Sequence, residues 1–418
     1  MAAPDETRCD RAPWREMQGP GLEPGTTHDP ISEDALLERC SEEAVHLLLE
    51  NLTPTGVLAA SRSAAADARS YNRVFGRDAA ICALAMSGSG NPALERGAVD
   101  GLDALAAGQA SNGQIPKFIE PDGAGADFWY VGCIDATLWW LIAVDHVRRT
   151  GAVPPDTWEP AVQRALQWLQ AQEHPRFSLL QQNEASDWAD MMPRSGFVLY
   201  TNALWYRVKC LFELPNREDT LAHFESLFHP FGRDLPAYRR SRLLRHYAIR
   251  RQRNRGLYLS FVNLSFAGDE GDVFGNLLAI LFGLASDSRA HEIIEALRTA
   301  RVADPYPVRV VTRPIDRDHE LWRAYMERHR QNRPQQYHNG GVWPFVGAFW
   351  VLALLRLGKS DLARAELVKL ARVNALDDGR FTEWFHGASL APMGMAGQSW
   401  NAAMFLVARQ AVERALLA

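Results

Sequence analysis

The sequence lacks the patterns that mark several large classes of protein. Its five cysteines are scattered and form no Cys-x-x-Cys pair, which argues against a disulfide framework and against a zinc site. No uncharged apolar run approaches the roughly 20 residues that a membrane helix needs, and residues 1–21 lack the apolar core of a signal peptide. We therefore expect a reduced, cytoplasmic protein that binds no membrane and holds no metal.

The chain also lacks a surplus of basic residues. Lys and Arg number 45 against 50 Asp and Glu, a formal net charge of −5 over 418 residues. Binding to a phosphate backbone needs a clear excess of positive charge, so we do not expect nucleic acid as a partner. One exception is the arginine-rich stretch 233–255, which we interpret as a solvated helix or an inter-helix insertion. A site for a phosphate-bearing sugar is the alternative interpretation of this stretch.

Alternating strand patterns are rare, and the best candidates, 257–266 and 308–312, are short. Apolar residues at helical spacing instead recur along the chain. Ser32 is a predicted N-cap, and Asp156 with Glu159 suits a capping box. The same spacing returns later in the chain, at 290–297, 362–370 and 398–417. The chain is therefore predicted to be mostly α-helical.

Composition divides the chain into a short arm and one large domain. Residues 1–30 are rich in Pro, Gly and charge, which is typical of a flexible arm. Over residues 31–418, helices followed by long polar loops recur roughly every 50–60 residues. A ring of paired helices would produce this alternation. Its loops would gather at one end and form the functional site of a single catalytic domain.

Two segments place polar side chains just before apolar helices. Arg77 and Asp78 precede the apolar run 79–86, and a helix-capping Asp beside a surface ion pair explains them as well as a functional role does. Asp135 comes shortly before Trp139 and Trp140. By composition alone, an N-cap ahead of a buried aromatic helix is the favoured interpretation of that segment.

A third segment, 184–194, concentrates carboxylates beside a tryptophan. Glu184, Asp187 and Asp190 fall within seven residues of one another, with Trp188 between the last two. Carboxylates packed together near apolar surface have a raised pKa, which a general acid needs to be protonated near neutral pH. A solvated acidic loop is the alternative, but the apolar neighbours fit that interpretation poorly.

The last two segments combine aromatic residues with hydrogen-bonding groups. His338 and Asn339 offer polar side chains, two glycines follow them and allow close backbone approach, and Trp343 comes next. Glu383 sits between aromatic residues, where an unpaired carboxylate is costly. Either a buried ion pair or a catalytic base explains Glu383.

Two separated carboxylates on opposite sides of a sugar are the minimal machinery of glycoside hydrolysis. Asp190 and Glu383 would supply them, but they lie in distant parts of the chain and only the fold can bring them together. The sequence also has 13 tryptophans. We expect most of them in the core and a minority as stacking platforms for sugar rings.

Seven motifs in order carry a resemblance to a known family over roughly residues 71–418. They are 74–78, 135–140, 185–190, 274–278, 337–344, 382–384 and 398–400. In this order they resemble the (α/α)6-toroid glycoside hydrolases, and most closely the neutral/alkaline invertases and the amylo-α-1,6-glucosidase (glycogen debranching) domain. The resemblance implies an all-α (α/α)6 toroid, no cofactor, and a carbohydrate as the small-molecule partner.

The resemblance also implies roles for particular residues. Arg77 and Asp78 would grip hydroxyl groups of the glucose, Asp190 would be the acid with Asp187 as a weaker rival, and Glu383 would be the base. Most of the clan inverts, which predicts the two carboxyl groups about 6.5–9.5 Å apart. The remaining predicted substrate-binding residues are Asp135, Trp139, Trp188, His338, Asn339, Trp343, Trp384, Gln398 and Trp400.

The predicted function is hydrolysis of an α-glucosidic bond in a small soluble glucoside, with sucrose as the leading candidate. An α-1,6-linked glucan end is the alternative, because Val342 and the loop around Trp188 depart from the invertases toward the debranching domain. A sugar epimerase would need two histidines as acid and base, and only His338 and His386 lie in the suspect loops. A non-catalytic sugar-binding toroid would not need both Asp190 and Glu383. Toroids of this kind often pair, so a homo-oligomer is a further expectation.

Overall fold

The structure is a computed structural model that describes residues 32–129, 132–231 and 238–417. The predicted arm, residues 1–30, lies outside this part of the chain. Internal contacts join Glu33–Ala418 into one compact unit, which is the unit described below. Among the described residues, no helix is both long and apolar enough to cross a membrane.

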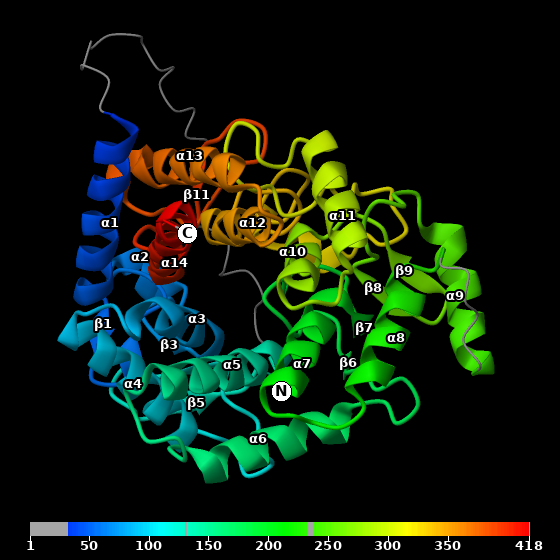
Figure 1. Cartoon of the computed structure of the whole chain (residues 1–418), viewed down its shortest axis with the longest axis horizontal. Coiled ribbons are helices and arrows are strands. Elements are labelled where there is room, and N and C mark those ends of the chain that lie inside the picture. Colours follow the sequence, from blue (N-terminus) through cyan, green and yellow to red (C-terminus); the bar gives the residue numbers. More distant parts are fainter. Residues whose placement is uncertain (1–31, 130–131, 232–237, 418) are drawn as a thin grey trace, which may run out of the picture. The chain divides into compact units, whose positions relative to one another are not determined.

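Six helices form a closed inner ring (Figure 1). Each contacts the next one along the chain, and the last contacts the first. In chain order they are α3 (Gly76–Met86), α5 (Ile134–Thr150), α7 (Leu199–Leu211), α10 (Val273–Leu281), α12 (Pro344–Arg356) and α14 (Ser399–Leu417). These helices are apolar on nearly all sides: every residue of α10 from Val273 to Ile280 is buried. A helix of this kind must be covered all round by other elements.

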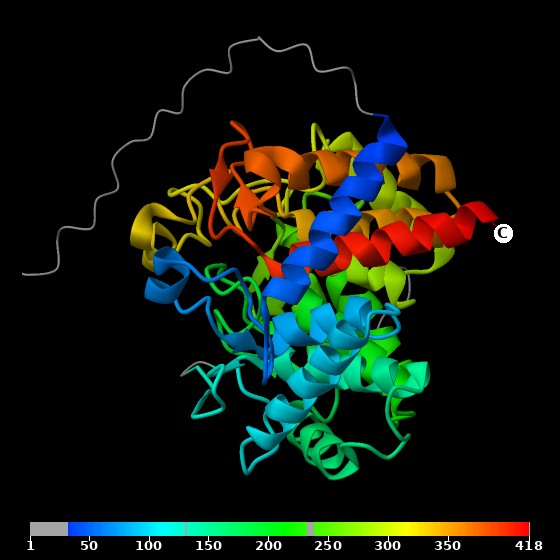
Figure 2. The same cartoon turned by 90° about the vertical axis from the view of Figure 1, so that its left-hand side faces the viewer.

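Six further helices cover the ring from outside, and each packs against at least one inner helix. They are α1 (Glu33–Glu50), α4 (Pro92–Ala107), α6 (Glu159–Gln172), α8 (Arg217–Phe228), α11 (Asp287–Thr299) and α13 (Ser360–Gly379). Figure 2 shows α1 lying across α14, the inner helix at the other end of the chain. Outer helices bury one face only, as α6 does with five small and aliphatic residues. The six inner and six outer helices confirm the predicted (α/α)6 arrangement.

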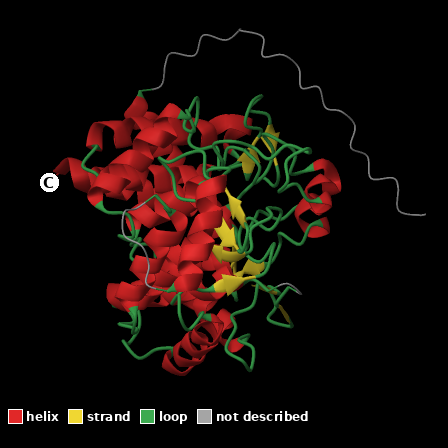
Figure 3. Ribbon diagram, turned by 90° about the vertical axis from the view of Figure 1, so that its right-hand side faces the viewer, coloured by secondary structure: helices red, strands yellow, loops and turns green. Residues whose placement is uncertain are grey.

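Because an outer helix returns the chain after each inner one, the inner helices all run in the same direction. Their N-termini therefore meet at one end of the ring, and the connecting loops gather there, as Figure 3 shows. The N-terminus of a helix carries a partial positive charge and unpaired N–H groups. Six such ends make this face of the ring favourable for carboxylates.

Short strands and three extra helical segments decorate this frame. The strands form antiparallel sheets in the orders β1-β2, β3-β4-β5, β6-β7-β8-β9 and β10-β11. Their bounds are β1 (Leu52–Thr53), β2 (Gly56–Val57), β3 (Val74–Phe75), β4 (Phe118–Ile119), β5 (Ala126–Asp127), β6 (Gln181–Gln182), β7 (Gly196–Val198), β8 (Phe261–Asn263), β9 (Phe266–Gly268), β10 (Trp384–Phe385) and β11 (Pro392–Met393). The extra helices are α2 (Ala64–Ala68), α9 (Arg239–Arg251) and a 3-10 helix at Ala324–Arg330.

Three local predictions can be compared directly with these elements. The strand candidate 257–266 contains β8 and the first residue of β9, whereas 308–312 makes only isolated bridges. Helix α9 confirms a helix within the arginine-rich stretch. The capping box of α6 is wrong: Asp156 lies in a preceding turn, and Trp158 takes the N-cap position with a left-handed φ of 67°. Two consecutive tight turns before the helix displace Asp156 from its predicted place.

Three asparagines near the starts of inner helices fix the loops that arrive there. In α7, Asn202 accepts from the N–H of Leu180 (2.7 Å) and donates to the carbonyls of Leu180 (3.1 Å) and Val198 (2.9 Å). Asn276 of α10 bonds to the backbone of Tyr258 and Asp272 in the same way. Asn401 of α14 donates to the carbonyl of Thr382 in the incoming loop and accepts from the N–H of Phe345 at the start of α12. Each of these asparagines is buried. Their side chains therefore satisfy loop backbone that no strand pairs.

We predict that Asn202→Ala lowers the free energy of unfolding by about 2–4 kcal/mol. The substitution leaves buried backbone groups of Leu180 and Val198 without partners, on either side of residues 184–194, which we call the acid loop because they carry the predicted acid. Urea denaturation followed by circular dichroism measures this loss. The exposed Gln167→Ala on α6 is the control, with an expected change below about 0.5 kcal/mol. Equal stability of the two variants would contradict the role assigned to Asn202.

Candidate functional site

The predicted site residues lie at five of the six inner-helix N-termini. Arg77 and Asp78 are in the first turn of α3, and Asp135 is in the first turn of α5. The loops before α7, α12 and α14 carry Asp187 with Asp190, His338 with Trp343, and Glu383 with Gln398. The parallel inner helices thus bring together segments that are more than 300 residues apart in the chain.

Arg77 connects three of these helices. Its Nη2 lies 3.1 Å from Oδ1 of Asp78 and its Nη1 lies 3.4 Å from Oδ2 of Asp135. Its guanidinium carbon is 5.3 Å from the ring centroid of Trp400. Burial raises the pKa of Asp78, and the positive charge of Arg77 opposes this rise. The predicted pair Arg77–Asp78 is therefore a buried unit, not a surface ion pair.

Asp135 has a supporting partner behind it, and Trp139 belongs to this support. Tyr200 donates its hydroxyl to Oδ2 of Asp135 at 3.1 Å, and Trp139 donates its indole N–H to the Tyr200 oxygen at 2.7 Å. Trp139 is 1% exposed. The prediction that Trp139 binds substrate needs correction: the indole is packed in the core and orients Asp135 through Tyr200.

Asp190 is the more accessible carboxylate of the acid loop, with a third of its side chain exposed. Its Oδ2 lies 3.7 Å from Nζ of Lys117, and its Oδ1 lies 3.9 Å from Nδ1 of His338. Burial raises the pKa of Asp190, while the charges of Lys117 and Arg77 oppose the rise. Lys117 in turn packs over the ring of Trp129, at 4.1 Å.

Asp187, the rival acid, is buried and its oxygens are occupied. Gln182 donates to its Oδ2 at 2.9 Å, and the N–H of Ala189 donates to its Oδ1 at 2.8 Å. Burial is the largest cause that raises the pKa of Asp187 to about 6, and Arg194 opposes it. A carboxylate so engaged shapes the loop, whereas Asp190 has a face open to a ligand.

Glu383 is enclosed, as its aromatic neighbours predict, and it lacks a cationic hydrogen-bond partner among the described residues. Tyr71 donates its hydroxyl to Oε1 at 2.7 Å, and the N–H of Met395 donates to Oε2 at 3.0 Å. Burial raises the pKa of Glu383 to about 7, and the bond from Tyr71 opposes this rise. Gly394 makes room for the carboxylate, since a Cβ there would lie 2.2 Å from Oε2.

Tyr337 shows that Asp190 and Glu383 share one neighbourhood. Burial raises the pKa of Tyr337 well above its usual range, and the charges of Asp190 and Glu383 raise it further. The Tyr337 ring lies 3.9 Å from that of His338, whose Nδ1 is 3.9 Å from Asp190, and 5.7 Å from that of Trp384, the residue after Glu383. One phenol thus lies within the electrostatic reach of both carboxylates, which come from loops almost 200 residues apart.

Aromatic rings line the space around these groups. His338 stacks on Trp343 at 14° between planes, and Trp400 stacks on Phe345 at 12°. Several buried polar atoms here have no hydrogen-bond partner among the described residues: Nε1 of Trp188, Trp384 and Trp400, Nε of Arg77, Nδ1 of His338 and both amide atoms of Gln398. Buried polar atoms rarely stay unbonded. Hydroxyl groups of a bound ligand would supply their partners.

The side chain of Asn339, in contrast, has hydrogen-bond partners for both of its polar atoms. Its Oδ1 accepts from the N–H of Ile315 at 2.7 Å, and its Nδ2 donates to the carbonyls of Ile315 (2.9 Å) and Asn332 (3.2 Å). The prediction that Asn339 contacts the sugar is therefore corrected to a role in shaping the loop. The neighbouring glycines do have the predicted function, since a Cβ on Gly341 would lie 2.7 Å from the carbonyl oxygen of Tyr337.

Tyr71, Lys117, Trp129 and Tyr337 are not among the predicted site residues. Tyr337 stands inside the motif 337–344, so its position was an available signal, whereas Tyr71 and Lys117 lie outside the seven motifs. Trp129 lies between two of the recognised motifs and has no local signature. Its contact with Lys117 depends on the fold of the long loop before α5.

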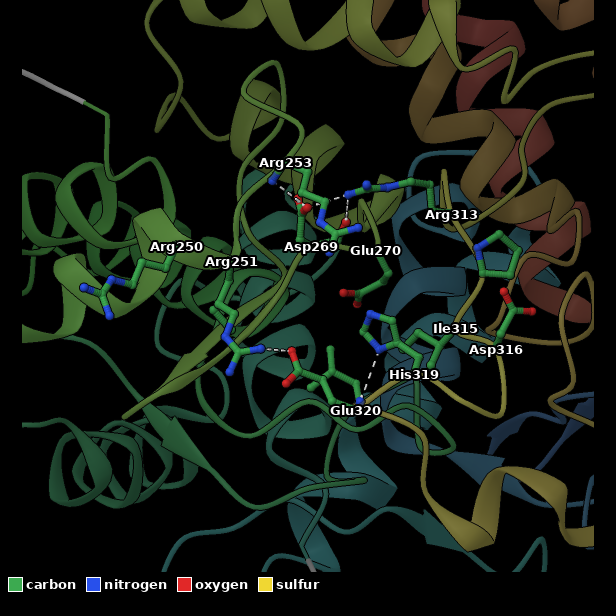
Figure 4. A pocket seen from close by; sticks show the side chains of 13 residues that line it. Arg250, Arg251, Arg253, Asp269, Glu270, Arg313, Ile315, Asp316, His319 and Glu320 are labelled. Atoms are coloured by element: carbon green, nitrogen blue, oxygen red, sulfur yellow. Dashed lines mark hydrogen bonds and ion pairs between the residues drawn. The ribbon is translucent and has the colours of Figure 1, made fainter.

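A hollow of about 320 Å³ lies beside the arginine-rich helix α9 (Figure 4). Two of its arginines pair with carboxylates: Arg251 with Glu320, and Arg313 with Asp269 at 2.5 Å. Glu270, also in its wall, is bonded to the buried Arg194 at 3.1 Å. This pairing gives no support to a phosphate site. No group of three or more potential metal ligands occurs in the part of the chain that the structure describes.

Solved structures of glycosidases share the fold over most of the chain. The mannosylglycerate hydrolase of family GH63 from Thermus thermophilus superposes with a TM-score of 0.61 at 15% identity, covering 88% of this chain and 99% of that one. The glucoamylase of Saccharomycopsis fibuligera superposes with a TM-score of 0.61 at 10% identity, covering 92% and 96%. The fold is the (α/α)6 toroid of these glycosidases.

Sequence similarity is confined to part of the toroid. Residues 272–415 match the family model of alkaline and neutral invertases. The probable alkaline/neutral invertase D of Arabidopsis thaliana is 32% identical over 146 residues, 33% of this chain and 26% of that protein. Cytosolic invertase 1 of Oryza sativa is 30% identical over 33% of this chain and 25% of its own length. The chain thus spans about a quarter of the length of these relatives. The segment that matches the family model includes Glu383 but not Asp190.

The stability of the toroid should reveal the raised pKa of Glu383. Below its ordinary pKa the group is neutral in both the folded and the unfolded chain; between that value and about 7 only the unfolded chain ionises, so the folded chain loses stability over this range and no further stability above it. We predict that at pH 8 Glu383→Gln is more stable than wild type by about 3 kcal/mol, with little difference at pH 4. Urea denaturation at pH 4 and at pH 8 measures the difference in the free energy of unfolding between Glu383→Gln and wild type.

The exposed Glu42→Gln, on outer helix α1, is the matched control for the chemistry of the substitution. A stability gap for Glu383→Gln that is the same at pH 4 and pH 8 would contradict a raised pKa at this position.

Proposed function

We propose that this chain is a glycoside hydrolase that cleaves an α-glucosidic bond with inversion, using Asp190 as general acid and Glu383 as general base. The observation that carries this proposal is the position of Tyr337, whose ring packs on His338 beside Asp190 and on Trp384 next to Glu383. Burial also raises the pKa of both carboxyl groups. Such pairs perform acid and base catalysis in glycosidases. The invertase relatives and the glycosidase folds support the same reaction class.

In the proposed reaction, protonated Asp190 gives its proton to the glycosidic oxygen as the bond from that oxygen to the anomeric carbon breaks. Ionised Glu383 takes a proton from the water that attacks the same carbon from the other face. Lys117, 3.7 Å from Asp190, stabilises the carboxylate that remains after proton donation. Arg77, Asp78 and the unbonded amide of Gln398 bind hydroxyl groups of the glucose.

For the substrate, sucrose is the leading candidate, because residues 272–415 match the invertase model and the two plant relatives described above are invertases. The second candidate is an α-1,6-linked glucan end, which the departures at Val342 and around Trp188 favour. An epimerase mechanism is disfavoured, because Nδ1 of His386 accepts from the N–H groups of Ala388 and Ser389. Cytoplasmic location and self-association stay predictions.

Replacing either carboxylate should abolish hydrolysis. We predict that Asp190→Asn and Glu383→Gln each lower kcat by about 10²–10⁴-fold, because one proton transfer is lost. Product assays on sucrose, trehalose, isomaltose, maltose and limit dextrin measure this and identify the substrate. Asp187→Asn should retain more activity than Asp190→Asn on the best substrate. The acid assignment is wrong if their order is reversed.

The pH profile should follow the environment of Glu383. A base must be ionised to act, so kcat/KM is expected to fall as pH drops through about 7. Because the Tyr71 hydroxyl holds this pKa down, Tyr71→Phe should move the acid limb to higher pH. Profiles of wild type, Tyr71→Phe and the remote control Tyr247→Phe test this. An acid limb that stays in place in Tyr71→Phe would refute the pairing.

A further inference from the structure

Beside the acid loop lies a larger hollow of about 800 Å³, which we call the amide groove. Its walls come from the segment before α5, from β6 and the loop before α7, and from the outer helix α6. The first two wall segments immediately precede inner helices. The amide groove therefore opens at the end of the ring that carries Asp190 and Glu383.

Aromatic side chains in the amide groove differ from those of the proposed catalytic centre. Phe128 and Trp168 are partly exposed and Trp129 is 36% exposed, whereas Trp343 and Trp384 are each 1% exposed. Open aromatic faces that line a concave surface are typical of a binding site. The apolar face of a sugar ring packs well on such rings.

The polar lining is made mostly of amides. Gln114, Gln172, Gln181 and Asn263 line the groove, and Nε2 of Gln114 is buried without a partner among the described residues. An amide both donates and accepts hydrogen bonds and carries no charge, as a sugar hydroxyl does. The carboxylate of the lining residue Glu184 accepts a hydrogen bond from Tyr325 at 2.6 Å and is paired with the charge of Arg323 at 3.2 Å. The chemistry of the amide groove thus fits a neutral, polyhydroxylated ligand.

Two contacts connect the amide groove with the acid. Trp129 lines the groove and packs on Lys117, whose Nζ is 3.7 Å from Asp190. Gln182 also lines the groove and donates to Asp187 in the acid loop. Since the acid protonates the leaving oxygen, a groove on its side is placed to hold the leaving group.

We infer that the amide groove binds additional sugar units of the leaving group, so that the preferred substrate is a neutral oligosaccharide longer than a disaccharide. This inference rests on the proposed hydrolase function and specifies its substrate class. A volume of about 800 Å³ lies in the range of pockets that enclose ligands of several rings. Sucrose would leave the amide groove empty, so this inference favours the second candidate substrate, a glucan end, over sucrose.

The test compares glucose oligomers of two to five units, α-1,4- and α-1,6-linked, with sucrose. In wild type, kcat/KM should rise with chain length for one linkage. Trp168→Ala and Gln181→Ala should each lose about tenfold or more on the longest oligomer, which is about 1.4 kcal/mol, and less than about twofold on the disaccharide. Gln167→Ala, on the same helix α6 but outside the groove, is the matched control. Gln181→Ala removes an exposed side chain and keeps the test valid if Trp168→Ala does not fold.

A calorimetric titration of Glu383→Gln with the same five-unit oligomers separates binding from catalysis. Binding that the groove variants weaken, with no hydrolysis of any sugar by wild type, supports the amide groove and refutes the hydrolase. Hydrolysis that is independent of chain length and unchanged in Trp168→Ala and Gln181→Ala overturns the amide groove and leaves the hydrolase in place. Neither binding nor hydrolysis of any sugar would overturn both.

Discussion

The parallel direction of the six inner helices is the constraint on which the rest of this structure depends. Each outer helix returns the chain, so every inner helix starts at the same end of the ring, and the last packs against the first. The N-termini at this end bring unpaired N–H groups and partial positive charge to one place. Asp78, Asp135, Asp190 and Glu383 all lie in or next to the segments that meet at this end.

This arrangement encloses groups that water would otherwise solvate. Glu383 is 2% exposed, and burial raises its pKa to about 7 although Tyr71 and the N–H of Met395 donate hydrogen bonds to it. Arg77 instead lies between two acidic side chains, which compensates for its burial. The same face therefore contains both compensated and uncompensated charges. Uncompensated burial weakens the fold and prepares a group for proton transfer near neutral pH.

The hollow beside α9 and the amide groove show that the side chains lining a concave surface decide what it can bind. Beside α9, Arg251 and Arg313 are paired with carboxylates. The amide groove is lined by neutral amides and partly exposed aromatic rings, one of which, Trp129, packs on Lys117 beside Asp190. A neutral saccharide matches the second lining better than the first. The arginine-rich composition of the α9 region is thus a weaker guide to function than the pairing of its side chains.

Much of the fold was predictable because its signals are local. Apolar spacing indicated the helices, the alternation of helices with long loops indicated a ring, and the motifs around Asp190 and Glu383 marked the loops of the site. The misplaced capping box near Asp156 shows the limit of such signals, since consecutive tight turns decided where α6 begins.

The sequence by itself determined which segments are helical and which carboxylates stand among apolar neighbours. Only the tertiary structure decided which side chains meet. Tyr71 bonds to Glu383 across 312 positions of the chain, and the side chain of Asn339 bonds to the backbone of Ile315. Trp139 supports Asp135 through Tyr200 instead of facing a ligand. The reason is physical. Hydrogen-bond partners and burial are properties of distance in space, and the closure of the ring sets those distances.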